Sequence, residues 1–370
     1  MPLTNPDEGR MLLREVEKQP NKFVFGVKGA IFNTVLALVT PIARDGDLGK
    51  EYAQAHTYLL DLPGRGKTAI LKYLSAAITA KLGRIDGRAD TLPSDLTGYE
   101  HVDRFTGTRT LLKGPLHSNI FFDDEINRTP PKGQSPMLGG MEGGYVIMNV
   151  TNIKTGELEA KRFPLYPISD DPNETRMFFI CLATANPIEF EGTYPLSEAQ
   201  KERFTYGIRM GLPDRENEMM IRPWNVAGKK VETVMDLATL LDIQDMVKQI
   251  RLSQAAEEYV MRLIENSRPY SQDLEEWSKI KPRKATRELV DFINRYVISG
   301  CSPRRNFHIV GAAQAFAFMR GENETATVDD VRAIAPITME HVILLQPRAE
   351  GDDITPRKLV QKIIDETILP

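Results

Sequence analysis

One glycine-rich segment constrains the fold more than any other feature, and it reads Leu62-Pro63-Gly64-Arg65-Gly66-Lys67-Thr68. Glycines let successive backbone N–H groups converge on a phosphate, the lysine reaches the β- and γ-phosphates, and the hydroxyl ligates Mg²⁺. An apolar run at Thr57 to Leu60 precedes the segment, and a helical pattern at Thr68 to Leu82 follows it. The pattern predicts a strand, a phosphate loop and a helix whose N-terminal dipole favours an anion. The predicted nucleotide-binding residues of this loop are Pro63, Gly64, Arg65, Gly66, Lys67 and Thr68.

One position departs from the full phosphate-loop pattern, which has glycine where this chain has Asp61. A carboxylate there would weaken or tune nucleotide binding. The alternative interpretation of the whole segment is a chance glycine-rich turn before a helix. A second motif is needed to decide between them.

That second motif is the run Ile120 to Phe122 followed by Asp123-Asp124-Glu125. An apolar strand of this kind delivers acidic groups to its carboxyl end, where open α/β sheets bind ligands. Asp124 is predicted to hold Mg²⁺ through water, with Thr68 as the other metal-binding residue, and Glu125 to orient and polarise the attacking water. Capping of a helix by the acids is the alternative, but it explains neither the strand nor the upstream loop.

The rest of the chain alternates between short apolar runs and helical patterns. A further strand is predicted within Met177 to Ala183, a protruding hairpin at residues 144–175, and helices at Asp7 to Gln19 and Lys28 to Ile42 before the first strand. After Pro213 the patterns are helical, with predicted helices at residues 214–222, 242–250, 255–266, 284–299, 306–320 and 328–345. We therefore predict an N-terminal helical extension (1–20), an α/β nucleotide-binding core (21–213) and a helical second domain with a C-terminal extension (214–370).

Charge and composition exclude few classes of protein. The 47 basic and 51 acidic residues give a net charge of −4, so nucleic acid is an unlikely partner despite local basic clusters at residues 222–230 and 279–287. No apolar run approaches the ~20 residues of a membrane helix and no basic, apolar leader opens the chain. The two cysteines, Cys181 and Cys301, fit a reducing compartment. A cytoplasmic protein is the resulting expectation.

The segment from Asp124 to Lys132, Asp-Glu-Ile-Asn-Arg-Thr-Pro-Pro-Lys, resembles the signature of the MoxR family of AAA+ ATPases. Further blocks resemble that family in the same order, and they are Leu92–Gly98, Lys113–Leu116, Ala183–Leu196, Glu198–Phe204 and Ser302–Arg304. The resemblance spans roughly residues 20 to 345. It implies an AAA+ core, in which helices sandwich a parallel five-stranded sheet, followed by an all-α lid.

The resemblance also implies roles for residues outside the two motifs. Asn186 would help to hold the attacking water, and Arg203 would point into the neighbouring subunit's site to stabilise charge on the transferred phosphoryl group. Arg304 would reach the γ-phosphate from its own subunit, with Arg305 as the competing candidate. Val24 and Gly26 belong to the stretch that cups the adenine. An arginine acting in trans implies a ring, most often a hexamer.

The function implied is that of an ATP- and Mg²⁺-dependent motor that remodels, assembles or activates a client protein, commonly beside a von Willebrand factor A domain protein. The longer 144–175 hairpin and the extra residues 268–282 depart from the family pattern and indicate surfaces for a partner. Two other classes stay open. One is a nucleotide-gated scaffold with low turnover, favoured by Asp61; the other is a ring motor that moves nucleic acid or inserts a metal.

Overall fold

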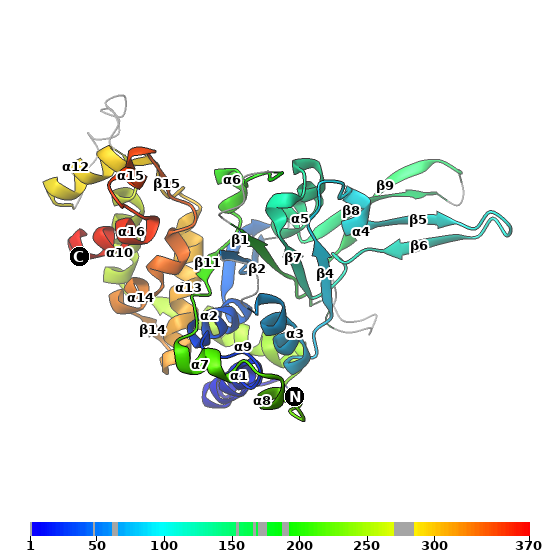
Figure 1. The fold of residues 1–370 in the computed structure, drawn as a ribbon, viewed down its shortest axis with the longest axis horizontal. Coiled ribbons are helices and arrows are strands. Elements are labelled where there is room, and N and C mark those ends of the chain that lie inside the picture. The colour runs from blue at the N-terminus through cyan, green and yellow to red at the C-terminus, as the bar shows by residue number, and fades with distance from the viewer. Residues whose placement is uncertain are drawn as a thin grey trace.

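A computed structural model describes residues 2–46, 49–60, 66–152, 155–165, 168, 176–186, 192–269 and 285–370 (Figure 1). Asp61 and the predicted loop residues Pro63, Gly64 and Arg65 lie outside this part of the chain. So do residues 270–284, which include most of the predicted insertion.

The predicted five-stranded sheet is confirmed. Its order is β11-β3-β10-β7-β4, and every neighbouring pair is parallel. The strands are β3 (Thr57–Leu60), β4 (Leu82–Asp86), β7 (Ile120–Asp124), β10 (Ile180–Ala185) and β11 (Tyr206–Arg209). β3 has the predicted bounds, while β10 begins three residues later than the apolar run that predicted it. Parallel pairing of strands that follow one another through helices produces the alternation seen in the sequence.

Helices cover both faces of the sheet. Because successive strand residues point to opposite faces, Phe121 joins the core under α5 (Pro131–Gly143), and Phe122 joins the core under α3 (Lys67–Ala77). The larger core also includes α1 (Pro6–Asn21) and α2 (Lys28–Val39). The predicted helix from Thr68 to Leu82 ends at Ala77, because Thr79 has a positive φ and β4 begins at Leu82.

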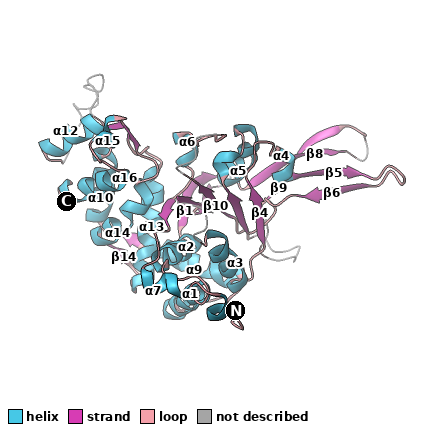
Figure 2. Cartoon of the chain, viewed as in Figure 1, coloured by secondary structure: helices cyan, strands magenta, loops and turns pink. Residues whose placement is uncertain are grey.

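Three antiparallel hairpins stand outside the main sheet. The predicted 144–175 hairpin is present as β8 (Tyr145–Thr151) paired with β9 (Leu158–Pro164). A second one, β5 (Gly98–Val102) with β6 (Arg109–Lys113), follows α4 (Pro93–Thr97), and both project from the same end of the molecule (Figure 2). The third, β1 (Pro41–Gly46) with β2 (Gly49–Gln54), replaces the end of the predicted 28–42 helix, since Pro41 cannot continue a helix. The prediction that Thr57 to Leu60 is the first strand of the chain was therefore wrong.

From residue 254 onward the described chain lies at the end opposite the two hairpins, whereas residues 215–249 lie beside α1 and α2 (Figure 1). The described residues after Pro213 belong to one largely helical part. Its elements are α7 (Arg215–Met220), α8 (Pro223–Val226), α9 (Leu237–Gln249), α10 (Gln254–Asn266), α12 (Arg287–Tyr296), α13 (Arg305–Arg320), α14 (Val328–Met339), α15 (Arg348–Gly351) and α16 (Pro356–Glu366). The short strands β12 (Arg251–Leu252), β13 (Val297–Ser299), β14 (Thr325–Ala326) and β15 (Leu344–Leu345) join them in pairs. Capping explains one shifted start, because the Asp236 side chain accepts from the Thr239 N–H and begins α9 before the predicted Asp242.

The N-terminal helix packs on the core, with α1 in contact with α2, α3 and α9. The proposed boundaries at residues 20 and 213 remain predictions. Within the described part of the chain, no helix combines the length and apolar character that a membrane crossing needs.

Candidate functional site

The carboxyl edge of the sheet gathers most of the predicted site residues. In the parallel register Leu60 aligns with Ala185, and Asp123 aligns with Ala183. The carboxyl ends of β3, β7 and β10 therefore lie side by side, and Glu125 and Asn186, which follow β7 and β10, emerge together at this edge.

The described end of the phosphate loop is Gly66, which leads directly into the N-terminus of α3. Gly66 has φ 81°, a left-handed conformation that favours glycine, and it caps the N-terminus of α3. A Cβ at Gly66 would lie 3.0 Å from Val24 Cγ1, so Val24 packs against this loop. Lys67 is buried in the first turn of α3. Gly26, with φ 77°, packs closely on Pro213, which places the 24–26 stretch between the loop and the helical part.

Asp124 is held by a hydroxyl that the sequence did not reveal. Thr184 Oγ1 donates to Asp124 Oδ1 at 2.8 Å and accepts from the Glu125 backbone N–H at 2.8 Å. The other oxygen, Oδ2, lies 3.2 Å from the Arg84 guanidinium, which is 42% exposed. Pairs so exposed contribute little, about 0–1 kcal/mol, and leave the carboxylate available to a cation. A carboxylate with the Thr68 hydroxyl is a donor set that suits Mg²⁺, so these residues fit the implied metal.

Glu125 occupies a strained turn at the end of β7. Its φ of 62° and ψ of 50° lie in the left-handed region, which costs a residue other than glycine about 1 kcal/mol or more. Gly87 permits this turn, because a Cβ there would come within 2.2 Å of the Glu125 carbonyl oxygen. The Glu125 carboxylate pairs with Arg128 at 3.0 Å. The turn therefore presents the carboxylate in one fixed direction at the sheet edge.

Replacing Thr184 by valine should leave both the Asp124 and the Glu125 carboxylates less well positioned, because the hydroxyl between them is lost. The Glu125 N–H would lose its acceptor, so we expect the free energy of unfolding to fall by about 1–3 kcal/mol. We also expect kcat for ATP hydrolysis to fall about 10- to 100-fold, as for other residues that orient a metal-binding or catalytic side chain through a hydrogen bond. Denaturant unfolding and steady-state kinetics measure the two effects. Thr184→Ser keeps the hydroxyl and should stay near wild type; equal losses in the two variants would contradict the role of the hydroxyl.

Asp123, which precedes the site, is fully buried on the α5 face of the sheet. Neither of its carboxyl oxygens has a hydrogen-bond partner among the described residues. Burial, with Asp124 and Asp86 nearby, raises the pKa of Asp123 well above its usual range. Burial therefore favours the protonated form of this side chain.

Asp123→Asn should change the pH dependence of stability. The unfolded chain ionises this carboxyl above pH ~3.9 while the folded chain keeps the proton, so wild-type stability falls by up to about 1.4 kcal/mol per pH unit as pH rises towards the folded pKa. Asparagine removes this term, and the stability advantage of the variant should grow as pH rises from about 4 towards the folded pKa of Asp123. Denaturant titrations across this range test it, with the exposed Asp90→Asn as the control. An advantage that does not change with pH would contradict a raised pKa.

Arg203 lies at the opposite, amino edge of the sheet. It precedes β11, and the N–H groups of Thr205 and Tyr206 donate to the carbonyl of His56 just before β3. Arg203 Nη2 donates to Glu142 Oε2 at 2.9 Å. Glu142 belongs to the last turn of α5, which runs back from the carboxyl edge to this one.

Arg304 lies at the same edge and shares this partner, with Nη2 donating to Glu142 Oε1 at 3.0 Å. The strands between the two edges are four to six residues long, a separation of roughly 10 to 20 Å at about 3.3 Å per residue. In this structure the Arg304 guanidinium lies beside Arg203 and away from the phosphate-loop edge of its own subunit. The contact of Arg304 with the γ-phosphate of its own subunit stays a prediction.

The choice between Arg304 and Arg305 follows from burial. Arg305 is 0% exposed; it pairs with Glu202 at 2.7 Å and donates to the Phe204 carbonyl at 2.9 Å. Arg304 is 53% exposed at the start of α13. Arg305 links the helical part to the core through these bonds. The guanidinium of Arg304 is exposed, so it can contact another molecule.

The sequence interpretation missed several residues that shape the site. Thr184 stands in the quoted block from Ala183 to Leu196, where its hydroxyl was the available signal. Arg84 and Gly87 belong to a strand and turn that were not located, and Glu142 had no sequence signal beyond its glycine neighbours.

Comparison with known proteins agrees with this architecture. Residues 56–206 match the family model of the ATPase family associated with various cellular activities (AAA), and residues 293–363 match that of the AAA lid domain. The chain is 30% identical to the uncharacterised protein YeaC of Bacillus subtilis, over 86% of each chain. It is 27% identical to chaperone MoxR1 of Mycobacterium tuberculosis, covering 86% of this chain and 75% of the relative.

A solved structure supports the same assignment. The crystal structure of a proposed ATPase from Cytophaga hutchinsonii superposes with a TM-score of 0.77 at 26% identity, covering 99% of this chain and 97% of the other. The motifs, the strand order, the lid and these relatives agree. The chain belongs to the MoxR family of AAA+ ATPases.

Proposed function

We propose that this chain hydrolyses ATP in a six-membered ring, in keeping with the family resemblance, at sites shared between neighbouring subunits, and uses the cycle to remodel a client protein. The observation that carries the proposal is the separation of two sets of groups. The phosphate-loop end, Asp124, Glu125 and Asn186 lie at one sheet edge, while Arg203 and Arg304 lie at the other. A head-to-tail contact between copies would unite them.

In this proposal each described residue has one task. Gly66 and the α3 N-terminus bind the phosphates, Lys67 neutralises them, and Glu125 takes up a proton from the attacking water, which Asn186 helps to orient. Thr68 and Asp124 would hold Mg²⁺, which would neutralise further phosphate charge when bound. Both arginines of the neighbour then stabilise the charge that spreads over the transferred phosphoryl group.

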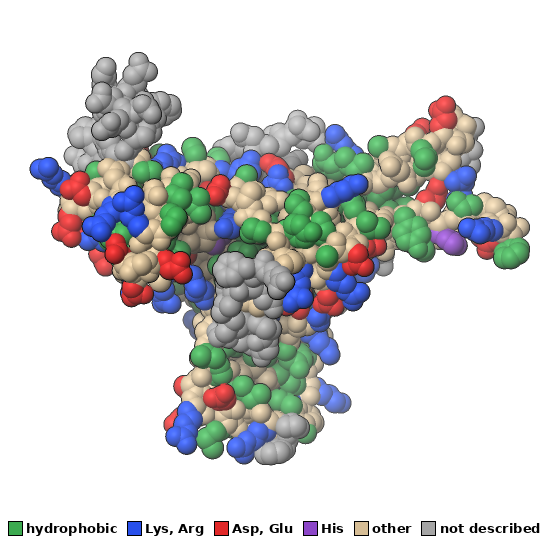
Figure 3. Space-filling model, turned by 45° about the horizontal axis from the view of Figure 1, so that its top comes forward, with side chains coloured by type: hydrophobic (Ala, Val, Ile, Leu, Met, Phe, Trp, Pro, Cys, Tyr) green, Lys and Arg blue, Asp and Glu red, His purple; other side chains and the backbone are tan. Residues whose placement is uncertain are grey.

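The two projecting hairpins are proposed to contact the client. Glu100 on β5 accepts from the Thr151 hydroxyl of β8 at 2.6 Å, a bond that lowers the pKa of Glu100, and Arg109 donates to both residues. These bonds link the two hairpins, whose tips stand apart as two projections in Figure 3. Phe105 at the tip of the β5–β6 hairpin is fully exposed, as apolar residues of binding surfaces often are.

Two other proposals are weaker. A scaffold with low turnover needs neither the strained Glu125 turn nor paired arginines at the far edge. A nucleic-acid motor should be more basic than a chain with a net charge of −4. The von Willebrand factor A domain partner, metal insertion as the task and a cytoplasmic location stay predictions.

The test is ATPase activity as a function of protein concentration. Shared sites require assembly, so we expect Mg²⁺-dependent release of phosphate whose rate per subunit rises with concentration until native mass spectrometry shows the ring to be complete. Lys67→Ala should lose nucleotide binding and serves as the control. A constant rate per subunit from the monomer upward would refute shared sites, and no hydrolysis by assembled protein would refute the enzyme.

A further inference from the structure

We propose that Glu142 is a positioning residue that holds Arg203 of the core and Arg304 of the lid as one unit aimed at the neighbour's ATP. The inference rests on the proposed shared site. Its core observation is one carboxylate bridging two guanidinium groups, with Oε2 on Arg203 at 2.9 Å and Oε1 on Arg304 at 3.0 Å. The bridge spans two parts of the chain, because Arg203 precedes β11 and Arg304 begins the lid helix α13.

The bridge leaves both arginines able to bind a phosphate. Each is linked to Glu142 through Nη2, and a guanidinium carries five N–H donors in a fixed fork. Two guanidinium groups brought this close repel each other unless a negative charge lies between them. Glu142 supplies that charge and leaves the cluster with one net positive charge for an incoming polyphosphate.

The position of Glu142 has no explanation in the stability of its own helix. It lies in the last turn of α5, where the negative end of the helix dipole disfavours a carboxylate. Glycines flank it at 139, 140, 143 and 144, and a glycine inside a helix costs about 1 kcal/mol relative to alanine. The ion pairs of Glu142 with Arg203 and Arg304 offset this unfavourable helix-end position.

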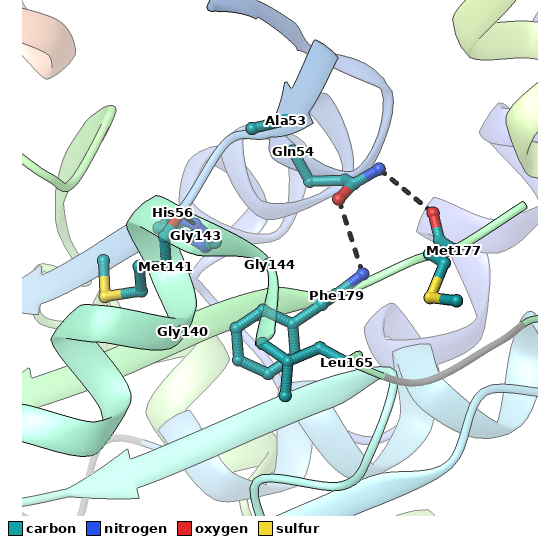
Figure 4. A pocket seen from close by; sticks show the side chains of 10 residues that line it. All are labelled: Ala53, Gln54, His56, Gly140, Met141, Gly143, Gly144, Leu165, Met177 and Phe179. Carbon is teal, nitrogen blue, oxygen red and sulfur yellow. Dashed lines mark hydrogen bonds between the residues drawn. The ribbon is translucent and has the colours of Figure 1, made fainter. Parts of the chain in front are cut away.

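The surroundings of Glu142 differ on its two sides. Its neighbours Met141 and Gly143 line a cavity of about 160 Å³ together with Gln54 and Phe179 (Figure 4). On the arginine side the lid is fixed, since Glu202 binds both the buried Arg305 and the Ser302 N–H at 3.0 Å. The Glu202 bonds therefore fix the start of the lid helix that carries Arg304.

The first test is Glu142→Gln, which keeps the shape and removes the charge. We expect kcat to fall about 10- to 100-fold, as small misplacements of a catalytic group do, with KM for ATP within about twofold. KM should hold because the phosphate loop lies at the other sheet edge. Glu198→Gln is the matched control, an exposed glutamate five residues before Arg203 that should leave both constants unchanged.

The second test determines which subunit's ATP site is slowed by the Glu142 substitution. It uses rings formed with an excess of hydrolysis-deficient Glu125→Gln subunits. A minority of Glu142→Gln subunits should turn over at the rate of a wild-type minority, because their sites receive arginines from intact partners. A wild-type minority among Glu125→Gln/Glu142→Gln partners should be slowed by the same 10- to 100-fold, since the arginines now come from altered partners.

The outcomes separate this inference from the proposed function. A wild-type chain without ATPase activity would remove the proposed function itself. An active chain in which Glu142→Gln is as fast as wild type, or faster, would overturn the positioning role. The positioning role would also be overturned if a minority of Glu142→Gln subunits were slow among Glu125→Gln partners that keep Glu142. In that case Glu142 would act on the ATP site of its own subunit.

Discussion

Glu125→Gln is expected to stop ATP turnover and leave ATP binding intact. A positioned general base contributes about 10²- to 10⁴-fold, and glutamine at the same place cannot take the proton from water. Binding should persist, because the α3 N-terminus, Lys67 and Asp124 are untouched and the glutamine side chain has the same shape. Single-turnover hydrolysis and equilibrium binding of a fluorescent ATP analogue measure the two effects.

The neighbouring carboxyl gives a control for this variant. Asp123→Asn changes another acid of the same strand end, but one that is fully buried and whose pKa is raised by that burial. It should retain turnover close to wild type. If Glu125→Gln hydrolysed ATP as fast as Asp123→Asn, the strained turn would not be presenting a catalytic base.

Arg203→Ala is expected to have the largest effect of any change outside the phosphate-loop edge. Arginines that act on a neighbour's phosphoryl group contribute about 10³- to 10⁵-fold, so activity of the pure variant should approach background. Its own phosphate loop is unaltered, and ATP should still bind. Arg209→Ala is a suitable control, since Arg209 pairs with Glu340 at the other end of β11.

Mixing Arg203→Ala with Glu125→Gln subunits should restore ATPase activity, a result that is possible only if each site is shared between two subunits. Each variant lacks a different half of the site, so an Arg203→Ala site next to a Glu125→Gln subunit has a base and an arginine. Activity should rise above that of either variant alone. A mixture as inactive as its components, in rings shown to contain both, would contradict sharing.

Residues whose surroundings are set by nearby sequence were predictable. The bounds of β3 and the placement of Asp124 and Glu125 at a strand end follow from short apolar runs that stop at breakers. β4 and β11 were not located, because they are short and mix polar with apolar residues. Their existence followed only from the resemblance to a five-stranded family.

Long-range pairing is the part that the sequence could not supply. Glu142 meets Arg203 across 61 positions and Arg304 across 162, and no local pattern encodes either distance. Thr184 looked like one more residue of a buried strand until its hydroxyl was seen between Asp124 and Glu125. The side of the sheet on which Arg304 lies depends on where the whole lid docks, and the buried Arg305–Glu202 pair is part of that docking.

The location of the two sets of groups on opposite sheet edges gives any stack of these subunits a direction. Each copy offers arginines from one edge and an ATP site at the other, so an open row always ends in one site that no neighbour completes. A row of any length then has one working site fewer than it has subunits, and only closure into a ring removes that deficit. Under the proposed sharing, the rate of ATP hydrolysis per subunit would therefore report whether the assembly has closed.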